Sequence, residues 1–293
     1  MISHLPAGDV AHVTEHAAAK INLALHITGQ RDDGYHLLDT FVVFTHAGDT
    51  VTATSSAEDR FSMSGAFVGT LSTDSDNLVL RARDIVRALY PPLRPVALNL
   101  DKALPVASGI GGGSADAAAT LRALARLLGI ATDDAGLSAA ALSLGADVPM
   151  CLVSQPMRAQ GIGETLTPIA DVPKLHMVLI NPAVSVSTPT VFKALLEKHN
   201  APLPNPPARV DFAGLVDWLR HTRNDLQRPA SAQQPQISDA IAALDAAGAA
   251  FARMSGSGAT CFGLFPTAAA AQAAAQAIAS ASPTWYVKAT HTV

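Results

Sequence analysis

Cysteine is nearly absent from the 293-residue sequence. Cys151 and Cys261 are the only two, and they stand far apart without a second cysteine or a suitably spaced histidine beside either. This spacing excludes a disulfide framework and gives no sign of a structural zinc site. We expect both to be small buried residues.

Aromatic and charged residues are also scarce, and neither sign of charge is in large excess. Aromatic residues make up 5% of the chain and charged residues 15%, and the formal net charge is −4. Such a balance argues against a broad surface for nucleic acid or anionic membrane. A hydrophobic content of 49%, rich in alanine and leucine, predicts a folded protein with a large core. Any phosphorylated ligand must then be held locally, by backbone amides, one or two lysines and a metal ion.

Long hydrophobic runs are missing as well. In the most apolar tract, 268–281, two glutamines interrupt a run of alanines, and a surface helix fits it better than a membrane span of about 20 residues. His4, Asp9 and Glu15 precede the first apolar run, which is unlike a secretory signal. We therefore expect a cytoplasmic protein without nucleic-acid or membrane partners.

The hydrophobic periodicity predicts an α+β chain of two domains, 1–165 and 166–293, since the length exceeds the usual single-domain size. Alternation or short apolar runs predict strands at 19–27 (half-buried), 38–46, 49–55, 95–105, 147–153, 175–182 and 284–290, with a glycine turn between strands in 251–265. Helical spacing predicts helices at 77–90, 115–128, 136–146, 187–199, 238–248 and 267–281, while the proline-rich stretch 200–211 reads as a loop. Asn77, Thr188 and Ser238 are candidate N-caps, and Gly248 suits a helix end.

A glycine cluster runs straight into a helix in the segment PVASGIGGGSADAAATL, residues 105–121. The start of a helix has unpaired N–H groups and a partial positive charge, so it attracts anions. Gly109 and the run 111–113 would let the backbone fold closely around a phosphate. Ser114 or Asp116 can cap or charge the first helical turn. A merely flexible bend is the alternative at this point.

Two familiar nucleotide-binding loops fit the cluster poorly. A Walker loop needs a lysine beside its glycines, and none is present. The dinucleotide fingerprint needs a third glycine where Ser114 stands, which makes a dinucleotide-dependent oxidoreductase a distant alternative.

Four further clusters contain polar residues that local structure does not require. Lys20 and Asn22 lie on the polar face of a predicted strand, where they could equally face solvent. The segment DGYH ends in Tyr35 and His36, Asp147 precedes an apolar run in GADVPM, and glycines recur in MSGSGAT. Asp147 could cap a local turn instead of being a carboxylate held near a cleft. The segments DGYH and MSGSGAT could both be ordinary turns. Together the clusters supply an anion site, a cation and a carboxylate, which are the parts needed to transfer a phosphoryl group to a hydroxyl.

The segment PVASGIGGGSADAA resembles the phosphate loop P-x3-G-[LI]-G-[SG]-[SG]-S-A of the GHMP kinases, the family of galactokinase, homoserine kinase and mevalonate kinase. Five more segments resemble, in order between about residues 18 and 265, the family members that phosphorylate a methylerythritol bearing a cytidine diphosphate. They are AKINLALHITGQRDDGYHLLDT, GADVPM, PTVFK, RNDLQ and MSGSGATCFGLF.

This resemblance implies a two-domain GHMP kinase fold with the active site in the interdomain cleft. It implies that ATP, assisted by Mg²⁺, phosphorylates the substrate's 2-hydroxyl in the non-mevalonate route to isoprenoids. Asp147 matches the catalytic base and Lys20 the lysine beside it, where an ammonium favours a charged carboxylate. The residues matching the substrate side are Asn22, Tyr35, His36, Thr188, Pro189, Phe192, Gly256, Ser257 and Gly258. Those matching the ATP side are Asn77, Lys102, Pro105, Val106, Ala107, Ser108, Gly109, Ile110, Gly111, Gly112, Gly113 and Ser114.

The loop departs from the family pattern in small ways. Ala107 and Ser108 stand where many members have glycine, and Gly112 and Gly113 replace serines of the wider family. Neither change removes a backbone donor. Ser114 matches a position near the phosphates or the metal, but no residue is assigned as a metal ligand. The chain is expected to be a monomer or a homodimer. A kinase of another small alcohol and a non-catalytic sensor on the same scaffold are the alternatives. The segment DGYH and Phe192 disfavour the first, and the presence of Lys20 with Asp147 disfavours the second.

Overall fold

The computed structural model describes residues 12–70, 76–91, 93–106, 108–207, 209 and 211–293. The strands are β1 (His12–Gln30), β2 (His36–Ser55), β3 (Arg60–Ser64), β4 (Val96–Asp101), β5 (Met157–Gly161), β6 (Thr165–Pro168), β7 (His176–Asn181), β8 (Phe251–Met254), β9 (Cys261–Phe265) and β10 (Tyr286–His291). The helices are α1 (Leu78–Leu89), α2 (Gly112–Leu128), α3 (Ala135–Leu144), α4 (Val148–Val153), α5 (Thr188–Lys193), α6 (Phe212–Arg220), α7 (Gln227–Gln233), α8 (Gln236–Ala246) and α9 (Ala268–Ala281), with a 3₁₀ turn at Val68–Thr70. The predicted α+β class is confirmed. In the part of the chain described, no helix combines the length and apolarity needed to cross a bilayer.

The chain divides into two compact units, and it enters each of them more than once. The first unit contains residues 12–17, 48–104 and 113–152 of the described chain, and the second contains 18–47, 105–112 and 153–293. The long strands β1 and β2 contribute residues to both. These units interleave along the sequence, so they differ from the consecutive domains 1–165 and 166–293 expected from the sequence. The boundary at residue 165 stays a prediction.

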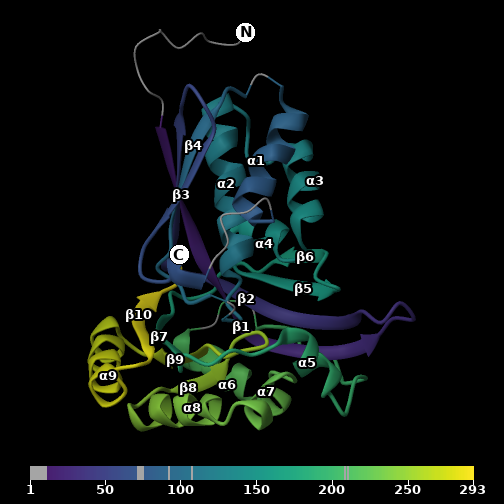
Figure 1. The fold of residues 1–293 in the computed structure, drawn as a ribbon. Coiled ribbons are helices and arrows are strands. Elements are labelled where there is room, and N and C mark those ends of the chain that lie inside the picture. The colour runs from purple at the N-terminus through teal and green to yellow at the C-terminus, as the bar shows by residue number, and fades with distance from the viewer. Residues whose placement is uncertain (1–11, 71–75, 92, 107, 208, 210) are drawn as a thin grey trace. The chain divides into compact units, whose positions relative to one another are not determined.

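In the first unit, helices lie beside a small sheet (Figure 1). β2 pairs antiparallel with β4 over 50–55, and β4 pairs parallel with β3. α1 packs against α3, and most of α2 is buried from Ala115 to Ala125. Alanine is both the best helix former and small, so a helix rich in it can be covered closely on several sides.

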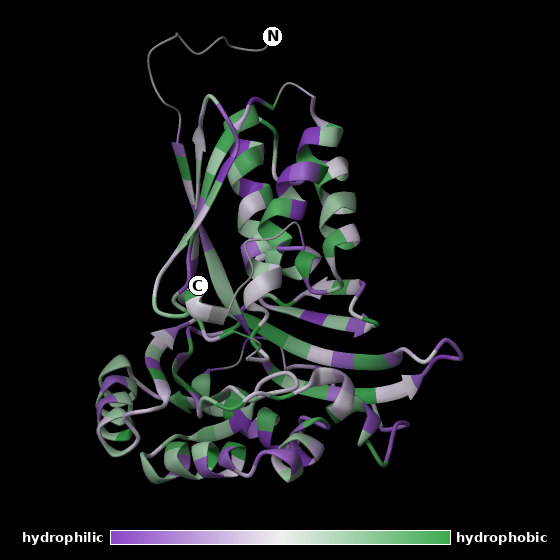
Figure 2. Ribbon diagram, in the orientation of Figure 1, coloured by the Kyte–Doolittle hydropathy of each residue, from purple (hydrophilic) through white to green (hydrophobic). Residues whose placement is uncertain are grey.

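The second unit contains an antiparallel sheet in the order β10-β7-β9-β8. Helices α8 and α9 pack against this sheet (Figure 1). Its core includes Val178 and Ile180 of β7, Leu244 of α8 and Ile278 of α9. In Figure 2 both helices alternate between hydrophilic and hydrophobic residues, as expected of helices with one face on a core. β2 also pairs with β5 over 38–42, and β5 pairs with β6.

Several local predictions are confirmed. The side chain of Asn77 caps α1, with its Oδ1 accepting the Val79 N–H at 3.0 Å. Gly248 follows α8 at a φ of +86°, which a residue with a side chain rarely adopts. Both cysteines are buried and free.

Other local predictions are wrong. The run 147–153 is the helix α4 instead of a strand, because so short an apolar run fits either element and Pro149 suits the first helical turn. β2 is one strand where two were expected, at 38–46 and 49–55. β1 is buried on both faces over 17–26 instead of half-buried.

The remaining corrections concern helix starts. Thr188 is the first residue of α5 and follows its N-cap Ser187. Ser238 lies inside α8, which begins at Gln236. Asp116 does not cap α2, because its carboxylate is buried against Lys102. Strands β3, β5 and β6 and helices α6 and α7 were not predicted from the sequence.

Candidate active site

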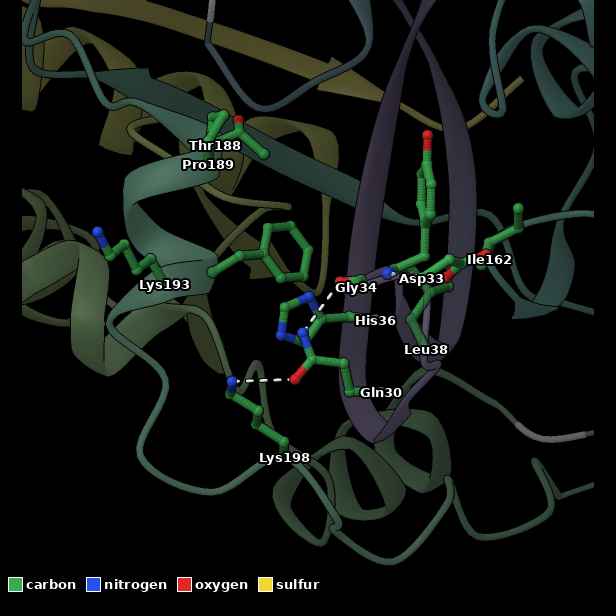
Figure 3. A pocket seen from close by; sticks show the side chains of 12 residues that line it. Gln30, Asp33, Gly34, His36, Leu38, Ile162, Thr188, Pro189, Lys193 and Lys198 are labelled. Atoms are coloured by element: carbon green, nitrogen blue, oxygen red, sulfur yellow. Dashed lines mark hydrogen bonds between the residues drawn. The ribbon is translucent and has the colours of Figure 1, made fainter.

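A cavity of about 640 Å³ opens in the second unit (Figure 3). Its lining residues are Gln30, Asp33, Gly34, Tyr35, His36, Leu38, Ile162, Thr188, Pro189, Phe192, Lys193 and Lys198. It therefore brings together five of the nine residues expected on the substrate side, from two distant parts of the sequence. Sequence reasoning missed its two lysines, although Lys193 ends the motif PTVFK and could have been noticed there.

His36 and Phe192 form the aromatic part of this cavity. Their ring centroids are 4.8 Å apart and the planes meet at 35°. Burial, and then the charge of Lys198, lowers the pKa of His36, so its imidazole is neutral at physiological pH. Its Nε2 is buried and has no hydrogen-bond partner among the described residues. A neutral ring with an unengaged nitrogen is suited to reading the polar edge of a planar ligand.

The turn that carries Tyr35 is anchored by neighbouring side chains. Gln30 Nε2 donates to the Gly34 carbonyl at 3.0 Å, and Lys198 Nζ donates to Gln30 Oε1 at 3.0 Å (Figure 3). The Tyr35 N–H donates to Asp33 Oδ1 at 3.2 Å. Tyr35 itself is 63% exposed, so its ring is accessible to a ligand.

Two glycine loops, residues 105–112 and residues 255–260, pack backbone against backbone in the second unit. The Thr260 N–H donates to the Ser108 carbonyl at 3.1 Å. A Cβ added to Gly109 would lie 2.6 Å from the Gly258 oxygen, and one added to Gly256 would lie 2.5 Å from the Gly109 oxygen. Both glycines also have a positive φ. The close approach of the two loops therefore requires glycine at these positions.

Lys20 lies along the first of these loops. It is 6% exposed, and its N–H donates to the Ile110 carbonyl at 2.9 Å. A Cβ on Gly111 would lie 3.3 Å from Lys20 Cβ and 3.4 Å from its Cε. Residue 111 must be small for the lysine stem to follow the loop so closely.

Asn22 is held in one orientation beside the second loop. Its N–H donates to Ser255 Oγ at 3.0 Å, and its Nδ2 donates to Thr40 Oγ1 at 2.8 Å. Thr40 uses its own proton on the Ala24 carbonyl, so it can only accept from Asn22. This fixes the amide and leaves Asn22 Oδ1 as a buried acceptor without a partner among the described residues. Such an acceptor is suited to a hydroxyl donor.

The second loop is also held from other directions. Thr188 Oγ1 lies 2.7 Å from Ser257 Oγ, so two residues expected on the substrate side touch each other. Asn224 Nδ2 donates to the carbonyls of Met254 and Gly256, each at 2.8 Å. Asn224 belongs to the motif RNDLQ, but the motif alone predicted no role for it. Its two hydrogen bonds make Asn224 one of the side chains that position this loop.

Asp147 lies in the first unit, directly before α4. It is half-buried, and its carbonyl accepts the Cys151 N–H at 3.2 Å. Arg122 of α2 holds the other end of this short helix, since its Nη1 donates to the Cys151 carbonyl at 2.9 Å. Its Nε donates to Glu15 Oε2 at 2.9 Å. The position of Asp147 thus depends on a helix that a mostly buried arginine secures.

We expect the variant Arg122→Met to lose about 3 kcal/mol of unfolding free energy, since it leaves buried acceptors unpaired. Its kcat should fall several-fold with little change in KM. Arg126→Met is the control, because Arg126 also pairs with Glu15, at 2.9 Å, but its side chain is 59% exposed and should contribute under about 1 kcal/mol. Denaturant unfolding and steady-state kinetics measure both effects. Equal stability of the two variants would contradict this role of Arg122.

The residues expected on the ATP side lie in differing surroundings. Gly112, Gly113 and Ser114 form the first turn of α2. Ser108 is buried, and its Oγ donates to the Pro105 carbonyl at 2.6 Å. Ala107 lies outside the described residues, and Val106 is 37% exposed. Lys102 is occupied by two buried carboxylates, Asp49 and Asp116. The contacts of these residues with ATP stay predictions.

Among the described residues, no group of three or more histidine, cysteine, aspartate or glutamate side chains is arranged to hold a metal ion. In enzymes of phosphoryl transfer, Mg²⁺ is usually held by one or two carboxylates together with substrate phosphates and water, so it needs no cluster of three protein ligands.

Comparison with known proteins agrees with the resemblance seen in the motifs. Residues 77–155 match the profile of the GHMP kinases N-terminal domain, and residues 210–283 match that of the GHMP kinases C-terminal domain. A 4-diphosphocytidyl-2-C-methyl-D-erythritol kinase from Mesorhizobium japonicum is 51% identical over 97% of this chain and 97% of its own length.

Solved structures show the same similarity. A crystal structure of a 4-(cytidine 5'-diphospho)-2C-methyl-D-erythritol kinase is 30% identical, with a TM-score of 0.79 over 96% of this chain and all of the other. A homoserine kinase from Cytophaga hutchinsonii reaches a TM-score of 0.70 over 100% of this chain and 97% of its own, at 18% identity, and so shows the fold alone. The chain has the GHMP kinase fold, and it belongs to the 4-diphosphocytidyl-2-C-methyl-D-erythritol kinase family of the GHMP kinases.

Proposed function

We propose that this chain transfers the γ-phosphate of ATP to the 2-hydroxyl of 4-diphosphocytidyl-2-C-methyl-D-erythritol. One observation supports this substrate most directly. The cavity beside His36 and Phe192 combines a neutral imidazole, an aromatic ring and two lysines. A pyrimidine base can stack on the ring and hydrogen-bond to the imidazole, while the lysines attract a diphosphate.

In this proposal the chemistry falls to Asp147 and Lys20. Asp147 takes the proton of the 2-hydroxyl as its oxygen attacks the γ-phosphorus and the bond to ADP breaks. The Lys20 ammonium offsets charge on the transferring phosphoryl oxygens. Asn22 offers its unpartnered Oδ1 to a hydroxyl of the methylerythritol unit and so orients it.

The first glycine loop and the start of α2 hold the ATP phosphates on backbone N–H groups. A Mg²⁺ ion would be held here by the ATP phosphates and the Ser114 hydroxyl, and it would supply positive charge that offsets the charge of the phosphates. The second glycine loop, Gly256, Ser257 and Gly258, covers the substrate. We place the enzyme in the cytoplasm as a monomer or homodimer whose partner is this small molecule.

We expect Tyr35→Ala and Phe192→Ala to raise KM for the cytidine substrate. Loss of a base–aromatic stack costs about 1–3 kcal/mol, so the rise should be about 5- to 150-fold. KM for ATP should not change. Tyr35→Phe keeps the ring and serves as the matched control, with a normal KM. An unaltered substrate KM in both alanine variants would reject the cytidine-binding role of the cavity.

The direct test of substrate class compares two acceptors of the wild-type protein, with ATP and Mg²⁺. One is the cytidine-diphosphate-linked methylerythritol, and the other is methylerythritol 4-phosphate, which lacks the cytidine. We expect ADP release at least about 100-fold more efficient with the first, as loss of a stack and a polar contact together predicts. Equal efficiency would show that the base is not recognised.

A further inference from the structure

Three charged side chains form a buried cluster in the first unit, which we call the buried triad. Asp49 lies in β2, Lys102 directly follows β4, and Asp116 lies near the start of α2. Their side chains are 0%, 4% and 5% exposed, respectively. Lys102 Nζ pairs with Asp49 Oδ2 and, at 2.8 Å, with Asp116 Oδ2. The ammonium therefore has two carboxylate partners and almost no contact with solvent.

The triad holds the chain on both sides of the first glycine loop. Asp49 Oδ1 accepts the N–H groups of Ala103 at 2.7 Å and Leu104 at 2.8 Å, the two residues directly before that loop. Asp116 lies in the helix that begins at Gly112, where the loop ends. Lys102 joins the two carboxylates, so a single ammonium ties the entry stem of the loop to its exit stem.

The charge of Lys102 stabilises both carboxylates of the triad. Burial raises the pKa of Asp116 to about 7, with the Asp49 charge adding to the rise and the Lys102 charge opposing it. Asp116 Oδ1 is buried without a hydrogen-bond partner among the described residues. Removing the ammonium would leave two buried carboxylates facing each other, which is strongly unfavourable.

We propose that Lys102 is a positioning residue for ATP: through Asp49 and Asp116 it fixes both stems of the first glycine loop, and its ammonium does not contact the nucleotide. This inference rests on the proposed binding of ATP phosphates at that loop. It differs from the expectation drawn from the motifs, in which Lys102 is a residue of the ATP side itself. A positioning residue and a direct ATP ligand predict different ATP affinities for the variant in which Lys102 and Asp116 are changed together.

The test is a double-mutant cycle of Lys102→Met, Asp116→Asn and the two combined, with the ATP dissociation constant measured by calorimetry. We expect each single variant to weaken ATP binding about 10-fold and the double variant to be no weaker than Lys102→Met, because both changes break the same link. KM for the alcohol substrate should stay within about 2-fold. Lys288→Met removes an exposed lysine from β10 and is the control for charge loss, with unchanged ATP binding.

Two results would overturn the inference. Losses of ATP affinity that multiply to about 100-fold in the double variant, or an Asp116→Asn variant with normal affinity beside a weak Lys102→Met, would make Lys102 a direct ATP ligand. If Lys102→Met does not fold, the milder Asp116→Asn still decides, because a positioning role requires it to weaken ATP binding. Calorimetry measures ATP binding without turnover. A failure of the proposed reaction would therefore be seen separately: the wild-type protein would bind ATP normally but release no ADP when the cytidine substrate is added.

Discussion

Changing Asp147 to Asn is expected to lower kcat by about 10²- to 10⁴-fold, the usual contribution of a general base. The amide keeps the size of the carboxylate and can still accept a hydrogen bond from the substrate hydroxyl, but it cannot take up the proton. The backbone start of α4 should be unaffected, because it is the Asp147 carbonyl that accepts the Cys151 N–H. ATP affinity and the substrate KM should therefore stay close to normal.

The control is Asp217→Asn, which neutralises an exposed carboxylate on α6 and should leave kcat unchanged. ADP release measures kcat, and calorimetry measures ATP binding. Turnover by Asp147→Asn within a few-fold of normal would mean that another group takes the proton, or that the substrate phosphate accepts it.

Gly109→Ala should have the second largest effect, this time on stability and on ATP binding. The added Cβ would lie 2.6 Å from the Gly258 oxygen and 2.8 Å from the Ser255 oxygen, both backbone atoms of the other loop. Residue 109 also has a φ of +74°. Positive φ at a residue with a side chain costs about 1–3 kcal/mol, and the contact with fixed backbone adds to it. We expect a loss of about 3 kcal/mol or more of unfolding free energy, with ATP binding weakened in whatever protein remains folded.

Gly113→Ala provides a matched control four residues away in the same glycine cluster. Its added Cβ would meet only Leu78 Cδ1, at 3.6 Å, an ordinary contact, and the residue lies in α2. Alanine in a helix is favoured over glycine by up to about 1 kcal/mol, so this variant should be as stable as the wild type or slightly more stable. Denaturant unfolding distinguishes the two variants, and equal stabilities would contradict the account of loop packing.

The sequence predicted best those features that depend on neighbouring residues. The helix after the glycine cluster, the cap at Asn77 and the turn at Gly248 follow from local spacing and from side-chain chemistry. The prediction of a strand at 147–153 was wrong because it used local pattern alone. Six apolar residues in a row fit a short helix equally well, and only the residues that pack on them decide between the two.

Features that depend on distant contacts were not predictable from local pattern. Lys20 and Asn22 could equally have faced solvent by sequence alone. Their burial follows from contacts with Ile110 and Ser255, far along the chain. The packing of Gly109 on Gly258 is likewise non-local. The motifs brought Tyr35, His36 and Phe192 into one hypothesis, whereas Lys198 lies in no motif, and only the fold brings it to Gln30.

The most direct test of the proposed function is ADP release by the wild-type protein, with ATP and Mg²⁺, from four acceptors measured side by side. They are the cytidine-diphosphate-linked methylerythritol, homoserine, mevalonate and galactose. We expect turnover with the cytidine compound alone. Turnover with one of the other alcohols would contradict the role given to the cavity at His36 and Phe192, and no ADP release from any of the four would contradict the kinase itself.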